Sequence, residues 1–550
     1  MPDKNKSASQ LFIDCLENEG VEYIFGIPGE ENLDVMDALL DSKIRFVTTR
    51  HEQGAAFMAD VYGRLTGKAG VCLATLGPGA TNLITGFADA NMDRSPIVGI
   101  AGQGSTVRMH KESHQILDLV NLFQPISKYA AEIVEPDIVP EVVRKAFKDA
   151  QAEKPGGSFI SFPENIAHSP VSDAEKPLKA QSPTTSHPPP EKIAQAAGII
   201  SAARYPIIMA GNGVVRARAA DALTRFAEAL NIPVTQTFMA KGCIPFSHPL
   251  SLGSVGLQAH DYVACGFDRA DVVICVGFDM VEYHPKLWHP NRDKKIIHID
   301  QTYAEVDAHY VLECGVIGDI AEALEQIAKQ AQPHPGEPTR GLREAINQEL
   351  LDFADDASFP LKPQRILSDT RKVMAKDDIL ISDVGAHKMW IARLYRCEKP
   401  NTCIISNGFA SMGIGVPGAL AAKLVHPEKR ILTITGDAGF MMNSQEIETA
   451  LRVGAAFVVM IWRDNEYGLI KWHQQRRFER TGFVDFTNPD FVKYAESFGA
   501  KGYRVESADA LIPTLEQAFA SNTVAVVEVP VDYSENMKLT EKLGNLVCPI

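Results

Sequence analysis

The sequence lacks the features of a membrane, secreted or nucleic-acid-binding protein. No apolar run in its 550 residues approaches the about 18 needed for a membrane-spanning helix, and the start, MPDKNKSASQ, lacks the apolar core of a signal peptide. The formal net charge of -15 provides no general positive field that would attract phosphate backbones or anionic lipids. We therefore expect a cytoplasmic protein with neither a nucleic acid nor a membrane as partner.

Cysteine motifs and complete nucleotide-binding motifs are also lacking. The nine cysteines form no C-x-x-C pair and no finger-like pattern with histidine, so most are interpreted as small core side chains. No P-loop occurs, and PIIMAGNGVVR contains only G-x-G, with Arg216 where a dinucleotide fingerprint needs its third glycine. A nucleotide-binding structural module is therefore a weak hypothesis.

The composition, with 45% hydrophobic and 22% charged residues, is that of a globular protein with several cores. Short apolar runs such as YIFGI, GVCLAT and DVVICVG alternate with amphipathic stretches, which predicts parallel sheets covered by helices. Segments rich in proline, serine and threonine interrupt this rhythm twice. The sequence predicts three doubly wound α/β domains at 1–168, 191–330 and 360–550, with linkers at 169–190 and 331–359.

Glycine-rich turns follow several of the predicted strands. In open α/β sheets, ligands bind at the carboxyl ends of strands, so these turns are candidate sites. The first is Gly26-Ile-Pro-Gly29, and the second is Leu76-Gly-Pro-Gly-Ala-Thr-Asn82, which opens a helix and leaves backbone N–H groups free. Taken alone, each is explained equally well as a simple turn.

Two further turns bring polar side chains to neighbouring strand ends. Asp437 follows the run RILTI and Asn465 follows AFVVMI, and one helix over 443–453 is expected to join the two strands. A right-handed crossover would place these strands side by side, so a carboxylate and an amide oxygen could meet one cation. Mg²⁺ is usually shared between one or two protein oxygens and a bound diphosphate. The alternative is a pair of unrelated turns.

These motifs together resemble a known family. GDAGF followed by DN is similar to the thiamine-diphosphate motif, and RHE with LGPGATN is similar to its pyrimidine-binding half. More narrowly, FGIPG, RHEQGAAFMADVYGR, SHQ, ISNGFASMGIGVPGA and DFVKYAESFGAKGYRVESADAL resemble the acetolactate synthase group. Ala438 and Asp464 depart from the usual form of the cofactor motif. The resemblance implies pyrimidine-binding, central and diphosphate-binding domains, in that order.

The resemblance also implies roles for individual residues. Glu52 would hydrogen-bond N1′ of the aminopyrimidine and favour its imino tautomer, although Thr49-Arg-His-Glu52 also fits a capping box in which Glu52 only starts a helix. Gln115 and His114 would face the reacting carbon from a partner subunit, or else lie on the surface. Magnesium would be held by Asp437, Asn465 and the carbonyl of Tyr467. The remaining cofactor-binding candidates are Pro28, Gly29, Thr75, Pro78, Asn82, Gly385, Ala386, His387, Met412, Gly436, Ala438, Gly439, Gly468, Leu469 and Ile470.

The central region indicates the subtype. Its segment VGFDMVEYHP, residues 276–285, lacks the arginine of the flavin-dependent branch and resembles the catabolic, flavin-independent branch. We therefore expect thiamine diphosphate and Mg²⁺ as cofactors, no FAD, and synthesis of 2-acetolactate and CO₂ from pyruvate. The resemblance implies a homodimer or homotetramer, with Glu52 and Asp437 of one site from different chains. The alternatives are another thiamine-diphosphate decarboxylase, oxidase or carboligase, an FAD-containing synthase, or a regulatory relative without turnover.

Overall fold

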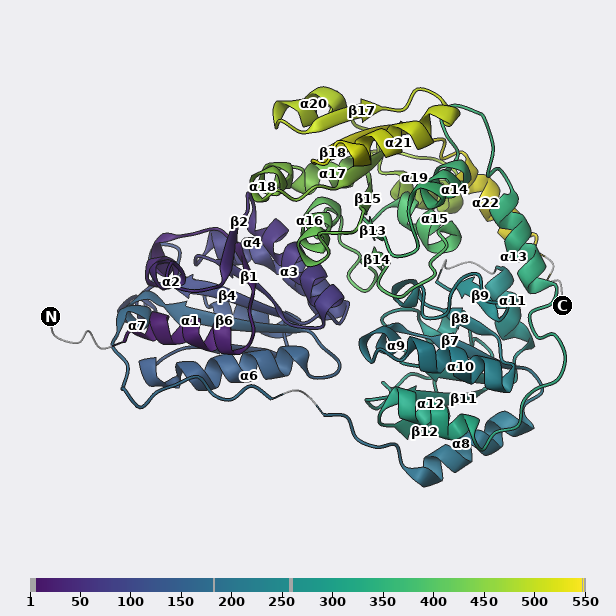
Figure 1. The fold of residues 1–550 in the computed structure, drawn as a ribbon, viewed down its shortest axis with the longest axis horizontal. Helices are drawn as coiled ribbons and strands as arrows, with labels where there is room; N and C mark the ends of the chain where they lie inside the picture. Colours follow the sequence, from purple (N-terminus) through teal and green to yellow (C-terminus); the bar gives the residue numbers. More distant parts are fainter. Residues whose placement is uncertain (1–5, 182–183, 257–260, 547, 549–550) are drawn as a thin grey trace. The chain divides into compact units, whose positions relative to one another are not determined.

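A computed structural model describes residues 6–181, 184–256, 261–546 and 548. It contains three six-stranded parallel sheets with helices packed against them (Figure 1), which confirms the predicted doubly wound α/β class. By its internal contacts the chain forms two compact units. Unit 1 holds the first sheet together with Gly408–Glu428 and Met441–Ala456, and unit 2 holds the other two sheets. The domain boundaries drawn from the sequence stay a prediction.

The first sheet has the strand order β2-β1-β3-β4-β6-β5. Its strands β3, β4 and β6 are buried along their whole length because helices cover both faces of a parallel sheet. Its edge strand β5 is only partly buried, and the apolar pattern did not predict it. The strands are β1 (Tyr23–Gly26), β2 (Arg45–Thr48), β3 (Gly70–Ala74), β4 (Ile97–Gln103), β5 (Tyr129–Glu132) and β6 (Gly157–Pro163).

The helices of this region are α1 (Ala8–Asn18), α2 (Leu33–Leu39), α3 (Glu52–Thr66), α4 (Pro78–Met92), α5 (Leu119–Phe123), α6 (Val139–Gln151) and α7 (Glu164–His168). In Figure 1, α1 and α6 lie on one side of the sheet and α3 and α4 on the other. Apolar side chains of α1 and α6, including Leu11, Phe12 and Phe147, form a core with the sheet. The predicted glycine-rich turns are at the ends of β1 and β3, next to α3 and α4.

The second sheet has the order β12-β11-β10-β7-β8-β9. Its strands are β7 (Pro206–Ala210), β8 (Val234–Gln236), β9 (Ser251–Ser254), β10 (Val272–Val276), β11 (Lys295–Asp300) and β12 (Leu312–Ile317). The helices are α8 (Pro190–Ala202), α9 (Asn212–Arg216), α10 (Ala220–Leu230), α11 (Tyr262–Arg269), α12 (Ile320–Ala328) and α13 (Leu342–Leu351). Successive residues of β10 belong to two separate apolar clusters, as expected of a sheet that is covered on both faces.

The third sheet has the order β14-β13-β15-β16-β18-β17. Its strands are β13 (Ile379–Ser382), β14 (Cys403–Ile405), β15 (Ile431–Gly436), β16 (Val458–Arg463), β17 (Lys501–Arg504) and β18 (Ala525–Pro530). The helices of this part of the sequence are α14 (Pro363–Val373), α15 (Ala386–Leu394), α16 (Gly415–Val425), α17 (Asp437–Asn443), α18 (Glu446–Val453), α19 (Gly468–Phe478), α20 (Phe491–Ser497), α21 (Leu511–Ala520) and α22 (Glu535–Gly544).

The predicted adjacency of the two strands that precede Asp437 and Asn465 is confirmed. β15 and β16 pair in parallel, with Gly436 opposite Trp462. The connection differs from the prediction, because two helices, α17 and α18, replace the single expected helix over 443–453. The break falls at Ser444 and Gln445, between the two helices. α17 therefore begins at Asp437 itself, directly after the strand.

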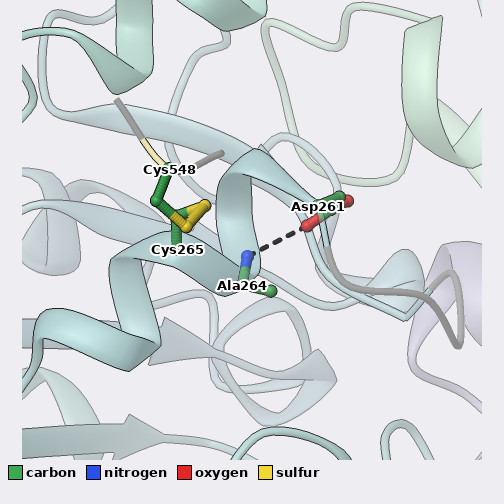
Figure 2. Close-up of a disulfide and its surroundings, with 4 residues drawn as sticks. All are labelled: Asp261, Ala264, Cys265 and Cys548. Carbon is green, nitrogen blue, oxygen red and sulfur yellow. Dashed lines mark hydrogen bonds between the residues drawn. A yellow bond between two sulfur atoms is a disulfide. The ribbon is translucent and has the colours of Figure 1, made fainter. Parts of the chain in front are cut away.

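One pair of cysteines forms a disulfide that the sequence did not predict. Cys265 in α11 is bonded to Cys548 near the C-terminus, with their Cα atoms 5.6 Å apart (Figure 2). Their sequence separation of 283 leaves no local spacing pattern that could predict the pair. The other seven cysteines are free and buried, as expected of small core side chains. Among the residues that the structure describes, no helix is long and apolar enough to cross a membrane.

Candidate active site

Glu52 is buried at the first position of α3. The predicted capping box does not form, because the residue that caps this helix is His51. The His51 ring accepts a hydrogen bond at Nδ1 from the Gln53 N–H at 3.0 Å, and the Thr49 hydroxyl donates to the His51 carbonyl at 3.1 Å. Since the helix starts at Glu52, this carboxyl is not at the third helical position from which a capping-box side chain reaches back.

A carboxylate from a distant part of the sequence binds the backbone before α3. Glu446, the first residue of α18, accepts hydrogen bonds from the N–H groups of Arg50 and His51, each at 3.0 Å. A Cβ atom at Gly54 would lie 2.8 Å from Glu446 Oε1, so this close approach favours glycine. Burial raises the pKa of Glu446 to about 7, against the lowering effect of its hydrogen bonds. The start of α3 is thus satisfied without Glu52.

The carboxyl of Glu52 instead meets the predicted residues of α4. The Asn82 amide donates to Glu52 Oε2 at 3.0 Å. A Cβ atom at Gly79 would lie 3.3 Å from Glu52 Oε1 and 3.0 Å from the Thr75 methyl carbon, so these three residues border one small space. The sequence named Glu52, Thr75 and Asn82 separately, and the structure brings them together in unit 1.

The turn after β1 packs against the same region. A Cβ atom at Gly29 would lie 2.3 Å from the Thr75 Cβ atom, which leaves no room for any other residue at position 29. The Thr75 hydroxyl donates to the carboxylate of Glu31 at 3.0 Å. Pro28 and Pro78 are both exposed, Pro28 in the turn and Pro78 as the first residue of α4. The two glycine-rich turns thus pack against the same side chain, that of Thr75.

His114 and Gln115 lie on an exposed turn, and Gln115 has a left-handed backbone with a φ angle of 59°. A Cβ atom at Gly77 would lie 2.8 Å from the carbonyl oxygen of Gln115, so this turn packs on the start of α4. Met412 is a partly buried residue in the turn before α16, also in unit 1. Its neighbour Ser411 donates its N–H to Asp89 at 3.3 Å. The roles of these residues toward a substrate or cofactor stay predictions.

The predicted diphosphate-binding residues surround one histidine in unit 2. Gly385 precedes α15, Ala386 starts it, and His387 is buried. Cβ atoms at Gly385 and Gly436 would lie 2.8 Å and 3.5 Å from the His387 Cε1 atom, so the ring sits between the ends of β13 and β15. Burial lowers the pKa of His387 to about 3, which makes the ring neutral. Its Nε2 atom has no hydrogen-bond partner among the described residues, so a buried polar atom remains for a ligand.

The predicted metal ligands Asp437 and Asn465 converge at the ends of β15 and β16. Asp437 is buried, and its Oδ2 atom accepts the Asn465 N–H at 2.7 Å. Burial raises the pKa of Asp437, and the N–H donors around it lower it. Asn465 has a φ angle of 60°, a conformation that asparagine adopts more readily than most residues. The Tyr467 carbonyl accepts the Lys471 N–H at 3.0 Å in the first turn of α19, and this bond occupies one of its two lone pairs.

These ligands fit a metal ion that is shared with a bound diphosphate, rather than one enclosed by protein ligands alone. Within the described part of the chain, no group of three or more His, Cys, Asp or Glu could hold a metal ion. One carboxylate, one amide and one carbonyl match the partial set that Mg²⁺ takes when a diphosphate completes its coordination. The other candidates lie around them: Ala438 and Gly439 in α17, and Gly468, Leu469 and Ile470 in the first turn of α19.

Sequence reasoning missed Asn488, which hydrogen-bonds both ligands. Its Nδ2 atom donates to Asp437 Oδ2 at 2.8 Å and to Asn465 Oδ1 at 3.0 Å. Asp464, one of the two departures from the usual motif, is next to the site, and burial with the nearby Asp437 raises its pKa to about 8. Asn488 carries no motif of its own and is distant in sequence from both ligands, so only the fold identifies it.

A buried carboxyl from the segment after β10 reaches the turn after β7 in the second sheet. Glu282 is buried and accepts the Asn212 N–H at the start of α9, at 3.1 and 3.0 Å to its two oxygens. It also accepts the Asp279 N–H at 3.3 Å and the Thr237 hydroxyl at 2.5 Å. Burial raises the pKa of Glu282 to about 7. This turn is the incomplete G-x-G motif of the sequence, and its leading N–H is already bound.

Comparison with known proteins yields matches along most of the chain. Three family models match: the thiamine pyrophosphate enzyme N-terminal TPP binding domain at residues 6–122, the central domain at 193–327, and the C-terminal TPP binding domain at 383–529. An acetolactate synthase of Bacillus subtilis is 36% identical over 560 residues, which cover 99% of this chain and 97% of that protein. A catabolic acetolactate synthase of Raoultella terrigena is 37% identical over 546 residues, covering 97% of each. A probable acetolactate synthase large subunit of Methanocaldococcus jannaschii is 34% identical over 567 residues, covering 98% and 95%.

Proposed function

Because this chain belongs to the acetolactate synthases, a family of thiamine pyrophosphate enzymes, we propose that Glu52 is its catalytic carboxyl and that Asp437 and Asn465 hold its metal. Its reaction is the decarboxylation of pyruvate and the joining of the remaining two-carbon unit to a second pyruvate, which yields 2-acetolactate and CO₂. The role of Glu52 rests on the state of its carboxyl group. This group is buried, does not cap the helix, and accepts a hydrogen bond from Asn82.

Thiamine diphosphate, when bound, supplies the carbon nucleophile that the reaction needs. Glu52 would hold a proton toward N1′ of the aminopyrimidine, and Asn82 orients the carboxyl through its hydrogen bond to Oε2. His387 remains neutral because it is buried, so its unpartnered Nε2 can serve the diphosphate region without adding charge. Asp437, Asn465 and the Tyr467 carbonyl would hold Mg²⁺ through oxygen atoms, the ligand type that this ion takes in proteins.

The proposed enzyme works without FAD. A dinucleotide phosphate would need free N–H groups at the turn after β7. Here the Asn212 N–H is already bound by Glu282, whose buried carboxyl occupies the place where a phosphate would bind. Arg216 also replaces the third glycine of the fingerprint. Purified protein should therefore show no flavin absorption between about 350 and 500 nm and should need no added FAD; a stoichiometric yellow chromophore would place it in the flavin-dependent branch.

The activity is tested by product analysis. Purified protein is incubated with pyruvate, thiamine diphosphate and Mg²⁺, and all products are identified by NMR. We expect 2-acetolactate and CO₂ as the main products. Acetaldehyde would indicate a simple decarboxylase, and acetyl phosphate, formed with phosphate and oxygen, would indicate an oxidase. Omission of Mg²⁺ serves as the control.

We also infer a homodimer or homotetramer in the cytoplasm, with pyruvate as its small-molecule substrate. The resemblance supports the assembly, since it implies that Glu52 of one chain and Asp437 of another serve one cofactor. Mixing inactive Glu52→Gln chains with inactive Asp437→Ala chains, under conditions of subunit exchange, should restore activity at about a quarter of the sites in a two-fold dimer. Activity that stays at the level of the separate variants despite exchange contradicts this assembly.

A further inference from the structure

Asn488 is the one side chain that joins the two proposed metal ligands Asp437 and Asn465 in the described structure. Both of its contacts, at 2.8 Å to Asp437 Oδ2 and 3.0 Å to Asn465 Oδ1, are acceptor oxygens, so the NH₂ end of its amide must face them. We propose that Asn488 is a positioning residue for the metal site, which fixes the distance and orientation of the two ligand oxygens. The inference rests on the metal site assigned under Proposed function.

The hydrogen bonds of Asn488 leave the ligands able to bind a cation. An amide oxygen has two lone pairs, and Asn488 uses one of those on Asn465 Oδ1. A carboxylate accepts about four hydrogen bonds. Asp437 accepts three, from the Ala438 N–H on Oδ1 and from the Asn465 N–H and Asn488 on Oδ2, so one acceptor position on Oδ1 remains for a cation. Asn488 therefore acts as an outer partner of the ligands, in the way that hydrogen bonds behind metal ligands commonly orient them.

The backbone around Asn488 ties it to the metal loop. The Phe486 N–H donates to the Asn465 carbonyl at 3.1 Å, and the Tyr467 N–H donates to the Val484 carbonyl at 2.8 Å. Glu466 and Asp485 form an antiparallel bridge between these two bonds. The segment 484–488 thus contacts Asn465 twice. Its backbone stabilises the left-handed backbone of Asn465, and its Asn488 side chain binds the Asn465 side chain. Backbone pairing and the side-chain amide fix the same ligand from two directions.

The test measures metal affinity directly. Mn²⁺, used as the probe for Mg²⁺, is titrated into wild-type, Asn488→Ala, Asn488→Ser and Asp437→Ala proteins at saturating thiamine diphosphate, and free Mn²⁺ is followed by electron paramagnetic resonance. Loss of an outer partner of metal ligands typically costs about 10- to 100-fold in affinity, which is the weakening expected for Asn488→Ala. The serine hydroxyl retains one donor, so Asn488→Ser should lie between alanine and wild type.

Asp490→Ala is the matched control for loop structure. Asp490 lies two residues after Asn488 and caps α20, where its carboxylate accepts the Val492 and Lys493 N–H groups at 3.1 and 3.3 Å. It contacts neither Asp437 nor Asn465. This variant should lose thermal stability but keep the Mn²⁺ affinity of wild type. The inference is wrong if Asn488→Ala binds Mn²⁺ within twofold of wild type or more tightly, or if Asp490→Ala weakens binding equally. Undiminished binding in Asp437→Ala would instead overturn the metal site itself, and the inference with it.

Discussion

Two buried glutamates satisfy backbone N–H groups at helix starts, with opposite consequences for ligand binding. Glu446 binds the Arg50 and His51 N–H groups before α3, and Glu282 binds the Asn212 N–H at the start of α9. In the first case the satisfied helix leaves another carboxyl, Glu52, available for chemistry. In the second case the carboxyl itself fills the position that a ligand phosphate would need. The same type of hydrogen bond thus leaves Glu52 free for its proposed role in one region and occupies a helix N-terminus in the other.

The largest expected effect is that of Glu52→Gln. An amide cannot favour the imino tautomer of the cofactor. Turnover, and exchange of the proton at C2 of the thiazolium ring of the cofactor, should therefore fall by about 10²- to 10⁴-fold, the usual contribution of a positioned acid or base. The midpoint of thermal unfolding should remain close to wild type, because Glu446 and His51 hold the helix start. Proton exchange is followed by NMR in deuterium oxide. Wild-type exchange rates would show that the buried carboxyl has no catalytic role.

Glu446→Ala should produce the next effect, on stability and activity together. It removes the acceptor of the partly buried Arg50 and His51 N–H groups, and the loss of these two hydrogen bonds to a carboxylate should cost about 1–3 kcal/mol in the free energy of unfolding. The loosened start of α3 should also slow C2 proton exchange. Glu446→Gln keeps an acceptor oxygen and is the matched control, with a smaller loss in both measurements. If alanine and glutamine behave alike, the hydrogen bonds of Glu446 do not hold α3.

Glu282→Gln should change how stability depends on pH. The folded carboxyl has a pKa of about 7 against an ordinary value of 4.5, so the folded state retains a proton that the unfolded chain has lost in this interval. The stabilising contribution is complete below pH 4.5 and is lost as the pH rises through 7, by about 3 kcal/mol. Urea unfolding at several pH values should therefore show a steeper decline for wild type than for Glu282→Gln. Parallel curves would mean that this carboxyl is already charged in the folded protein.

The smallest effect is expected for Thr237→Val. It removes the hydroxyl that donates to Glu282 at 2.5 Å and lowers the pKa of that carboxyl. We expect a loss of about 1 kcal/mol in the free energy of unfolding. This loss should be smaller below pH 7, because the protonated carboxyl needs fewer hydrogen-bond donors. Thr237→Ser, which keeps the hydroxyl, is the control. Equal stability of the valine and serine variants would show that the Thr237 hydroxyl does not stabilise this turn.

The sequence predicted the parts of the fold that depend on local pattern. Strands such as β3, β10 and β16 are continuous apolar runs because both faces are buried, and such runs are visible without a structure. The edge strands β5 and β17 were not predicted, because edge positions are only partly buried and their patterns are mixed. The capping box at Thr49, the alternative interpretation of Glu52, does not form, since the helix starts two residues later than that pattern requires.

The order of the residues is enough to locate the candidate site groups along the chain: glycine turns at strand ends, Glu52 after one strand, and Asp437 and Asn465 after two neighbouring ones. The packing of the folded chain selects which distant groups complete these positions. Glu446 reaches Arg50 across 396 residues, and Cys265 and Cys548 are separated by 283. Such contacts depend on how segments from different elements pack, and a buried N–H takes whichever acceptor the packing brings to it. No local pattern records that choice.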